Sequence, residues 1–143
     1  MTDLKGRLLA LDFGSHRIGV AVSDPLGITA RQLTAIRREG DRKDIEAIRS
    51  VSREHGVETV LIGLPLLPDG NEGSQAVKAR RFGEKIKELT GLPVVLRDER
   101  FSTAQAERHL IESGVRREKR KEVRDSLAAA LILQSALDAR SRK

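Results

Sequence analysis

The sequence predicts one α/β domain over residues 1–143, with a five-stranded mixed sheet that has helices on both faces. Three strand-like apolar segments stand before residue 37 with no helical pattern between them, which predicts an antiparallel meander. Two later strand-like segments each follow a helical pattern, and strands joined through a helix run parallel by right-handed crossovers. At 143 residues the chain is long enough to bury a core of this size.

The expected strands are short runs rich in apolar and β-branched residues. The first two are separated by a turn of about four residues, which is typical of a β-hairpin. Asp24-Pro25-Leu26-Gly27 has turn chemistry and separates the second strand from the third. The expected strand ranges are 8–12, 18–22, 28–36, 57–64 and 93–99.

Helical periodicity and terminal signals predict four helices. Asp41 can cap the first helix and Gly56 can end it, while Ser102 and Gln105 have the spacing of a capping box for the third. The expected helix ranges are 41–55, 74–89, 102–114 and 126–139. The apolar residues expected on their core faces are Ile45, Ile48, Val51, Ala76, Val77, Phe82, Ile86, Leu89, Leu127, Leu131 and Ile132.

Composition excludes several classes of protein. The chain has no cysteine, which excludes a disulfide framework and a thiolate metal site. It has no apolar run near the roughly 18 residues of a membrane span and no signal-peptide pattern, so the expected location is the cytoplasm. A net charge of +6 favours a polyanionic partner such as nucleic acid. With three Phe and no Tyr or Trp, phosphate and shape recognition are favoured over stacking on bases.

Acidic residues stand at the expected ends of two strands. Asp12 ends the first strand and Asp98-Glu99 end the fifth, while a loop rich in Pro and Gly, residues 65–73, follows the fourth. The carboxyl ends of parallel strands meet at one edge, where open α/β sheets bind their ligands. Asp12 alone has two interpretations of equal weight, a metal ligand or a turn Asp that accepts hydrogen bonds from nearby N–H groups.

Asp125 is the third candidate acid. It stands where the last helix is expected to begin, and by itself an N-cap is the better interpretation. Next to Asp12 and Glu99, a third carboxylate would instead complete a pocket of hard oxygen ligands. Such a pocket suits Mg²⁺ or Mn²⁺, and two such ions can activate a water and stabilise the leaving oxygen of a phosphodiester.

Four motifs in this order and spacing resemble the YqgF/RuvX family, and the resemblance covers nearly the whole chain. The motifs are Asp12-Phe13-Gly14 with 18–22, Gly63-Leu64-Pro65 with Asp69-Gly70, Asp98-Glu99-Arg100 with Ser102-Thr103, and Asp125 with Ala128-Ala129. The resemblance implies a ribonuclease H-like fold, with Asp12, Glu99 and Asp125 as metal-binding catalytic acids. Members of the family are described as nucleases that mature the precursor of small-subunit ribosomal RNA, or as Holliday junction resolvases.

Basic and hydroxyl residues near these acids are candidates for nucleic-acid contact. Arg100 could hold a phosphate or be a surface residue, and Ser102 and Thr103 are helix caps first and substrate contacts second. Residues 115–124 are expected to form a basic connector, which is either a solvated segment or a grip on a nucleic-acid backbone. The connector candidates are Arg116, Arg117, Lys119, Arg120 and Lys121.

The leading functional hypothesis is a metal-dependent endonuclease that uses Mg²⁺ or Mn²⁺ and acts on structured or precursor RNA. A resolvase acting on branched four-way DNA is the alternative within the enzymes. A non-catalytic RNA-binding ribosome-assembly factor is the alternative from another class. The chain lacks the P-loop pattern G-x-x-x-x-G-K-[ST], which excludes that type of nucleotide binding. A monomer and a homodimer both fit, and no membrane partner is expected.

Overall fold

The computed structural model describes the backbone of residues 4–98 and 117–141 and the side chains of residues 4–98 and 126–141. The helix expected at 102–114 lies outside the described residues. The described elements are β1 Leu8–Phe13, β2 Arg17–Ser23, β3 Ala30–Arg37, α1 Asp41–His55, β4 Thr59–Leu64, α2 Ser74–Thr90, β5 Val94–Asp98 and α4 Arg117–Ser141.

The five strands form one sheet in the order β3-β2-β1-β4-β5. β1 pairs antiparallel with β2, and β2 pairs antiparallel with β3. β4 lies parallel to β1 and β5 lies parallel to β4, so the carboxyl ends of these three strands share one edge. The predicted mixed sheet, with its meander and two parallel additions, is confirmed.

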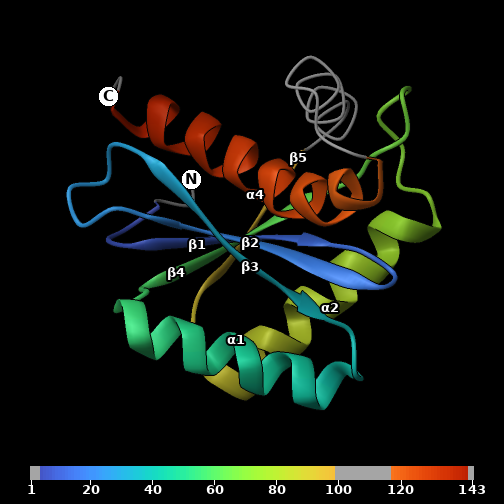
Figure 1. The fold of residues 1–143 in the computed structure, drawn as a ribbon, viewed down its shortest axis with the longest axis horizontal. Coiled ribbons are helices and arrows are strands. Elements are labelled where there is room, and N and C mark those ends of the chain that lie inside the picture. Colours follow the sequence, from blue (N-terminus) through green and yellow to red (C-terminus); the bar gives the residue numbers. More distant parts are fainter. Residues whose placement is uncertain (1–3, 99–116, 142–143) are drawn as a thin grey trace.

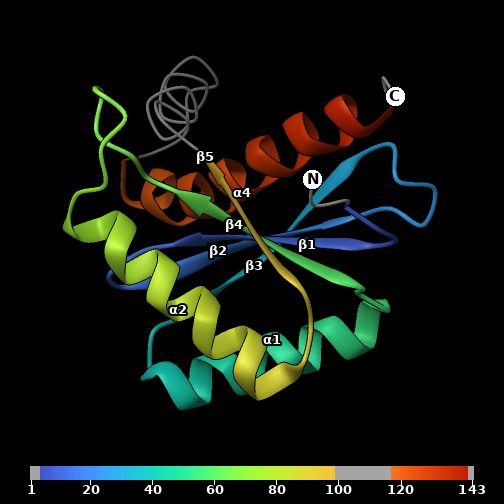
Figure 2. The same cartoon turned by 180° about the vertical axis from the view of Figure 1, so that it is seen from behind.

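Helices cover both faces of this sheet (Figure 1). On one face α1 and α2 enclose the larger core, in which Leu9 and Leu11 of β1 meet Ile45, Ile48 and Phe82. On the other face α4 packs through small residues, among them Ala129 and Ala136, against the alternate β1 residues Leu8 and Ala10. The view from behind shows the same two layers, with β4 and β5 in front (Figure 2). The Ala-rich sequence of the last helix therefore allows the close packing expected of it.

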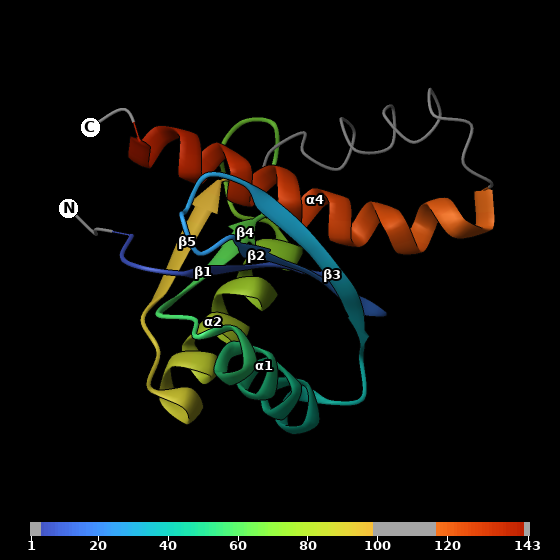
Figure 3. The ribbon, with the colours of Figure 1, turned by 60° about the vertical axis from the view of Figure 1, so that its left-hand side comes forward.

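Two side chains hold α4 against β3, the strand at the end of the sheet. The Ser126 hydroxyl donates to the Leu33 carbonyl at 2.8 Å. Two turns later the Gln134 amide accepts from the Ala30 N–H at 2.9 Å and donates to the Ile28 carbonyl at 2.9 Å. Figure 3 shows α4 lying across the sheet, with its first turns extending past the strands. The helix is thus fixed in register just after residue 125.

The start of α4 differs from the expectation. The helix begins at Arg117, so most of the expected connector 115–124 is helical and Asp125 lies inside the helix rather than at its opening. Lys, Arg and Glu dominate this stretch and are good helix formers, so it forms a helix without an apolar stripe. The helix α1 also differs, because Gly40 is its N-cap residue and Asp41 is its first residue.

Three of the apolar helix residues expected in the core are exposed. Val77 is 37% exposed on the solvent side of α2, and Leu131 is 36% exposed on α4. Leu89 is 48% exposed because it lies in the last turn of α2, next to the helix end. None of the helices in residues 4–98 and 117–141 combines the length and apolar composition that a membrane crossing requires.

Candidate active site

Asp12 lies one residue from the carboxyl end of β1 and is partly buried. Side chains alternate between the faces of a strand, and Leu8 and Ala10 of β1 pack against α4. Asp12 continues this alternation, so its carboxylate is on the α4 face of the sheet. The sequence therefore brings an acidic side chain to the edge at which β1, β4 and β5 all end.

Glycines flank Asp12 in the sheet. Its partner on β2 is Gly19. On the other side Leu11 pairs with Ile62 of β4, and the register carried one residue further brings Gly63 beside Asp12. Neither glycine places a side chain next to the carboxylate. The β2–β3 register also shifts between Ile18 and Val20, and such irregularities are frequent beside active sites. The positions beside Asp12 in the sheet thus carry no side chains.

The turn that follows Asp12 is tightly built. The Gly14 N–H donates to the Arg17 carbonyl at 3.0 Å. A Cβ on Gly14 would lie 2.5 Å from that same carbonyl oxygen, so the turn has room only for glycine at this position. The Asp-Phe-Gly motif therefore places a carboxylate just before the β1–β2 turn, whose tight packing requires glycine at position 14.

Arg38 fastens this turn to α1. Its guanidinium donates to the Gly14 carbonyl at 3.2 Å, to Asp41 at 2.8 Å and to Asp44 at 2.7 Å. The same group lies over the Phe13 ring, 4.5 Å from its centroid. The Asp44 side chain is only 1% exposed and also accepts from the Glu39 N–H at 2.9 Å. Arg38 is thus the charge that allows Asp44 to be buried beneath the turn.

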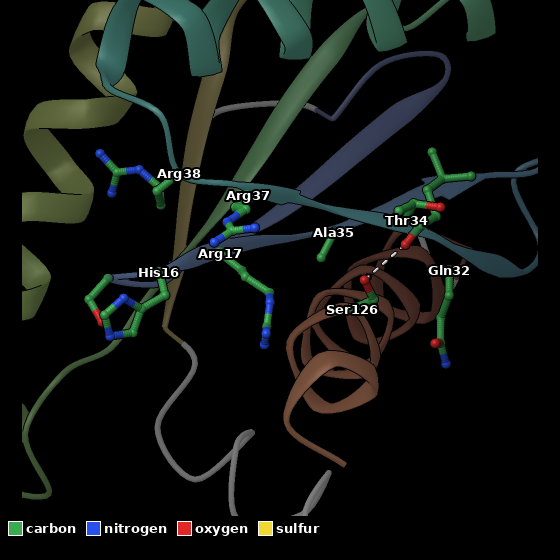
Figure 4. Close-up of a pocket in the computed structure, with 10 residues that line it drawn as sticks. His16, Arg17, Gln32, Thr34, Ala35, Arg37, Arg38 and Ser126 are labelled. Atoms are coloured by element: carbon green, nitrogen blue, oxygen red, sulfur yellow. Dashed lines mark hydrogen bonds between the residues drawn. The ribbon is translucent and has the colours of Figure 1, made fainter. Parts of the chain in front are cut away.

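A groove of about 880 Å³ opens beside the turn on the side of β3 and α4. His16, Arg17, Arg37 and Arg38 contribute basic side chains to its lining, and Gln32, Thr34 and Ser126 contribute polar ones. Figure 4 shows Arg17 and Gln32 on the same side of the strands as α4, whereas Arg38 lies toward α1. We call this hollow the active-site groove. Its cationic lining suits a phosphate backbone.

The structure describes only part of the predicted site. Five of the candidate residues lie outside the described residues: Glu99, Arg100, Ser102, Thr103 and Arg116. The part of α4 before Ser126 is described by its backbone alone, and it carries Asp125 together with the candidates Arg117, Lys119, Arg120 and Lys121. Asp125 stands four residues before Ala129 and seven before Ile132, two residues that are buried against the sheet. Among the side chains that the structure describes, no group of three acidic or histidine residues could hold a metal ion.

Four residues that position the site were not predicted. Ser126 and Gln134 dock α4, while Arg38 and Asp44 hold the turn. A signal existed for Asp44 alone, because it falls between Asp41 and Ile45 in the first turn of a helix whose apolar face begins there. The other three act on main-chain carbonyls of distant segments, and a contact of that kind leaves no pattern in the sequence.

Comparison with known proteins decides the family. Residues 6–139 match the model of a family described as RuvX: Holliday junction resolvase. The chain belongs to the RuvX family. The RuvX resemblance expected from the four motifs is confirmed, and with it the expectation of a nuclease of this family.

Relatives of this RuvX chain extend over almost its whole length. A protein of Syntrophus aciditrophicus named "Putative pre-16S rRNA nuclease" is 47% identical over 137 residues, covering 96% of this chain and 91% of the relative. One of the same name from Desulforamulus reducens is 48% identical over 132 residues, covering 92% and 96%. Thermus thermophilus RuvC, solved with a Holliday junction substrate, has a TM-score of 0.60 at 18% identity, covering 97% and 98%. That likeness shows the ribonuclease H-like fold.

Proposed function

We propose that this RuvX protein is a divalent-metal-dependent endonuclease that matures the precursor of small-subunit ribosomal RNA. The observation that carries the proposal is the position of Asp12, which stands between two glycines at the carboxyl edge of the sheet and on the face covered by α4. The active-site groove with its arginines opens beside the same turn. The choice of precursor small-subunit rRNA as the substrate is based on the names of the relatives.

Three carboxylates form the proposed metal site. Asp12 comes from β1 and Asp125 from α4, which packs against β1. Glu99 directly follows Asp98, the last residue of β5, and stands two positions after Arg97, which donates to Ser135 of α4. A set made only of carboxylate oxygens fits Mg²⁺ or Mn²⁺, and neither Gly19 nor Gly63 places a side chain beside Asp12 in the sheet. A bound divalent cation supplies charge stabilisation and a more acidic water.

The remaining residues bind and orient the substrate. Arg17 and Arg37 line the active-site groove and pair with phosphates, which fixes the position of the strand without reading its sequence. Arg38 holds the turn and so keeps Asp12 in one place. The basic residues from Arg117 to Lys121, at the start of α4, and Arg100 are assigned to further contacts with the phosphate backbone. Ser102 and Thr103 contribute hydroxyl donors.

A second candidate function is the resolution of four-way DNA junctions, which the description of the RuvX family favours. Both functions use the same hydrolysis of a phosphodiester, but a resolvase makes two symmetric cuts and therefore needs a homodimer. The small-subunit rRNA precursor is the preferred substrate because relatives at 47–48% identity carry that name.

Cleavage of the two substrates side by side tests the proposal. Purified protein is incubated with precursor small-subunit rRNA and with a four-way DNA junction, in Mg²⁺, in Mn²⁺ and in EDTA. We expect cuts at defined positions in the RNA with either metal and none in EDTA. Cutting of the junction alone would mean that four-way DNA, and not precursor rRNA, is the substrate. Cutting in EDTA would contradict metal dependence. Tight RNA binding without any cutting would instead favour a non-catalytic assembly factor.

A further inference from the structure

A second hollow lies on the other side of the β1–β2 turn. It measures about 370 Å³ and lies between Phe13 of β1, Arg38 and the first turns of α2. The front and back views of the fold place the start of α2 next to this turn (Figures 1 and 2). Ser15 and Arg38 line this hollow and the active-site groove alike, so the two meet across the turn. We call the second hollow the α2 groove.

The α2 groove is rimmed by positive charge. Lys78, Arg81 and Lys85 lie three and four residues apart on α2, so they form one stripe along the helix. The only acidic residue among the described residues that line it is Asp41, which is paired with both Lys85 at 2.7 Å and Arg38 at 2.8 Å. Lys78 and Arg81 are exposed, and within the described part of the chain neither has an ion-pair partner. Two positive charges therefore remain for a ligand.

Two packed aromatic rings and a guanidinium held by two carboxylates contribute to the lining of the α2 groove. The rings of Phe13 and Phe82 pack with their centroids 4.6 Å apart, and Phe82 is 2% exposed. The Arg38 guanidinium lies 4.5 Å from the Phe13 centroid and is held by its bonds to Asp41 and Asp44. The stripe from Lys78 to Lys85 spans about 10 Å of helix. This length corresponds to about three phosphates of one strand at about 3.4 Å of duplex axis each.

We propose that the α2 groove is a second nucleic-acid contact, at which Lys78 and Arg81 bind the phosphate backbone of the substrate segment that crosses the β1–β2 turn. The inference rests on the proposed function, because it assumes that the active-site groove holds a nucleic acid. A substrate that occupies both grooves is bent over the turn next to Asp12. Structured nucleic acid, whose strands continue on both sides of a cleavage site, provides such a segment.

Binding of the Lys78→Gln/Arg81→Gln variant tests this contact. Affinity for a fluorescent RNA stem-loop and for a four-way DNA junction is measured by anisotropy in EDTA over a series of salt concentrations. We expect the variant to bind about tenfold more weakly at moderate salt, and the slope of log K against log salt to be less steep by roughly 1.4–1.8, or 0.7–0.9 for each lost phosphate contact. Weaker binding of the variant to either nucleic acid supports the contact, and the nucleic acid that is affected is the one that the α2 groove binds.

Arg53→Gln/Lys87→Gln is the matched control. It removes one arginine and one lysine from the last turns of α1 and α2, at the other end of these helices. We expect this control to bind like the wild type, and thermal unfolding followed by circular dichroism shows whether both variants are folded. Equal affinities and salt slopes for the two variants would overturn the inference. Because EDTA prevents cleavage, this result is independent of whether the wild type proves to be a nuclease.

Discussion

Replacing Asp12 by Asn is expected to reduce the cleavage rate by at least about 10³-fold and to leave nucleic-acid binding intact or slightly stronger. A metal site contributes several kcal/mol of transition-state stabilisation, and each 1.36 kcal/mol corresponds to a tenfold change in rate. Asn has nearly the shape of Asp, but it lacks the charge that holds a hard cation. Removing a negative charge from the site also reduces repulsion of the phosphate backbone. Single-turnover cleavage and anisotropy binding measure the two effects separately.

Leu131→Gln is a suitable control for this variant. Leu131 is partly exposed on α4 and has no proposed role in catalysis or binding, so cleavage is expected to stay near the wild-type rate. A loss of binding by the Asp12→Asn variant that parallels its loss of cleavage would mean that Asp12 is structural. Retention of cleavage would remove Asp12 from the catalytic set.

Replacing Arg38 by Met is expected to lower the free energy of unfolding by about 3–5 kcal/mol, which is the cost of leaving a buried carboxylate without its charged partner. Asp44 is 1% exposed and its Oδ2 accepts from Arg38 at 2.7 Å. Met keeps the apolar stem of the side chain and removes only the guanidinium. Urea unfolding followed by circular dichroism measures the loss.

Two further variants identify the cause of this loss. Arg38→Met/Asp44→Asn removes the uncompensated charge and is expected to be more stable than Arg38→Met alone. The exposed Arg80–Glu72 pair, at 2.6 Å, provides the control. The hydrogen bond from Arg80 lowers the pKa of the Glu72 carboxyl, but water screens an exposed pair, so Arg80→Met is expected to have little effect on stability. Equal losses for Arg38→Met and Arg80→Met would contradict the role given to Arg38.

The sheet could be predicted because its signals are local and mutually consistent. Short apolar runs, a four-residue hairpin turn and helices between the last strands leave few topologies, and right-handed crossovers select one of them. Asp12 could be placed at the carboxyl edge for the same reason, since an acidic residue at the end of a buried strand belongs to that edge. The glycines beside it required the register, which a sequence pattern does not give.

The differences between the expected and the observed structure have separate physical causes. The charged stretch before Asp125 lacks an apolar stripe, so its pattern indicates a connector, although its residues favour a helix by intrinsic propensity. Val77 and Leu131 are apolar but lie on solvent faces, because apolar residues also make up much of a folded surface. Asp44 shows the reverse, because it is a charged residue that is buried in a pair with the half-buried Arg38.

The central claim is that Asp12 binds the metal ion used for cleavage, and an Asp12→Cys variant tests it most directly. The chain has no cysteine, so this variant carries a single thiol, and a thiolate prefers soft cations to Mg²⁺. Cleavage by the wild type and by the variant is compared in Mg²⁺ and in Cd²⁺. We expect the variant to be inactive in Mg²⁺ and to recover in Cd²⁺, so that its Cd²⁺-to-Mg²⁺ rate ratio exceeds that of the wild type. Equal ratios in the two proteins would contradict metal binding by Asp12.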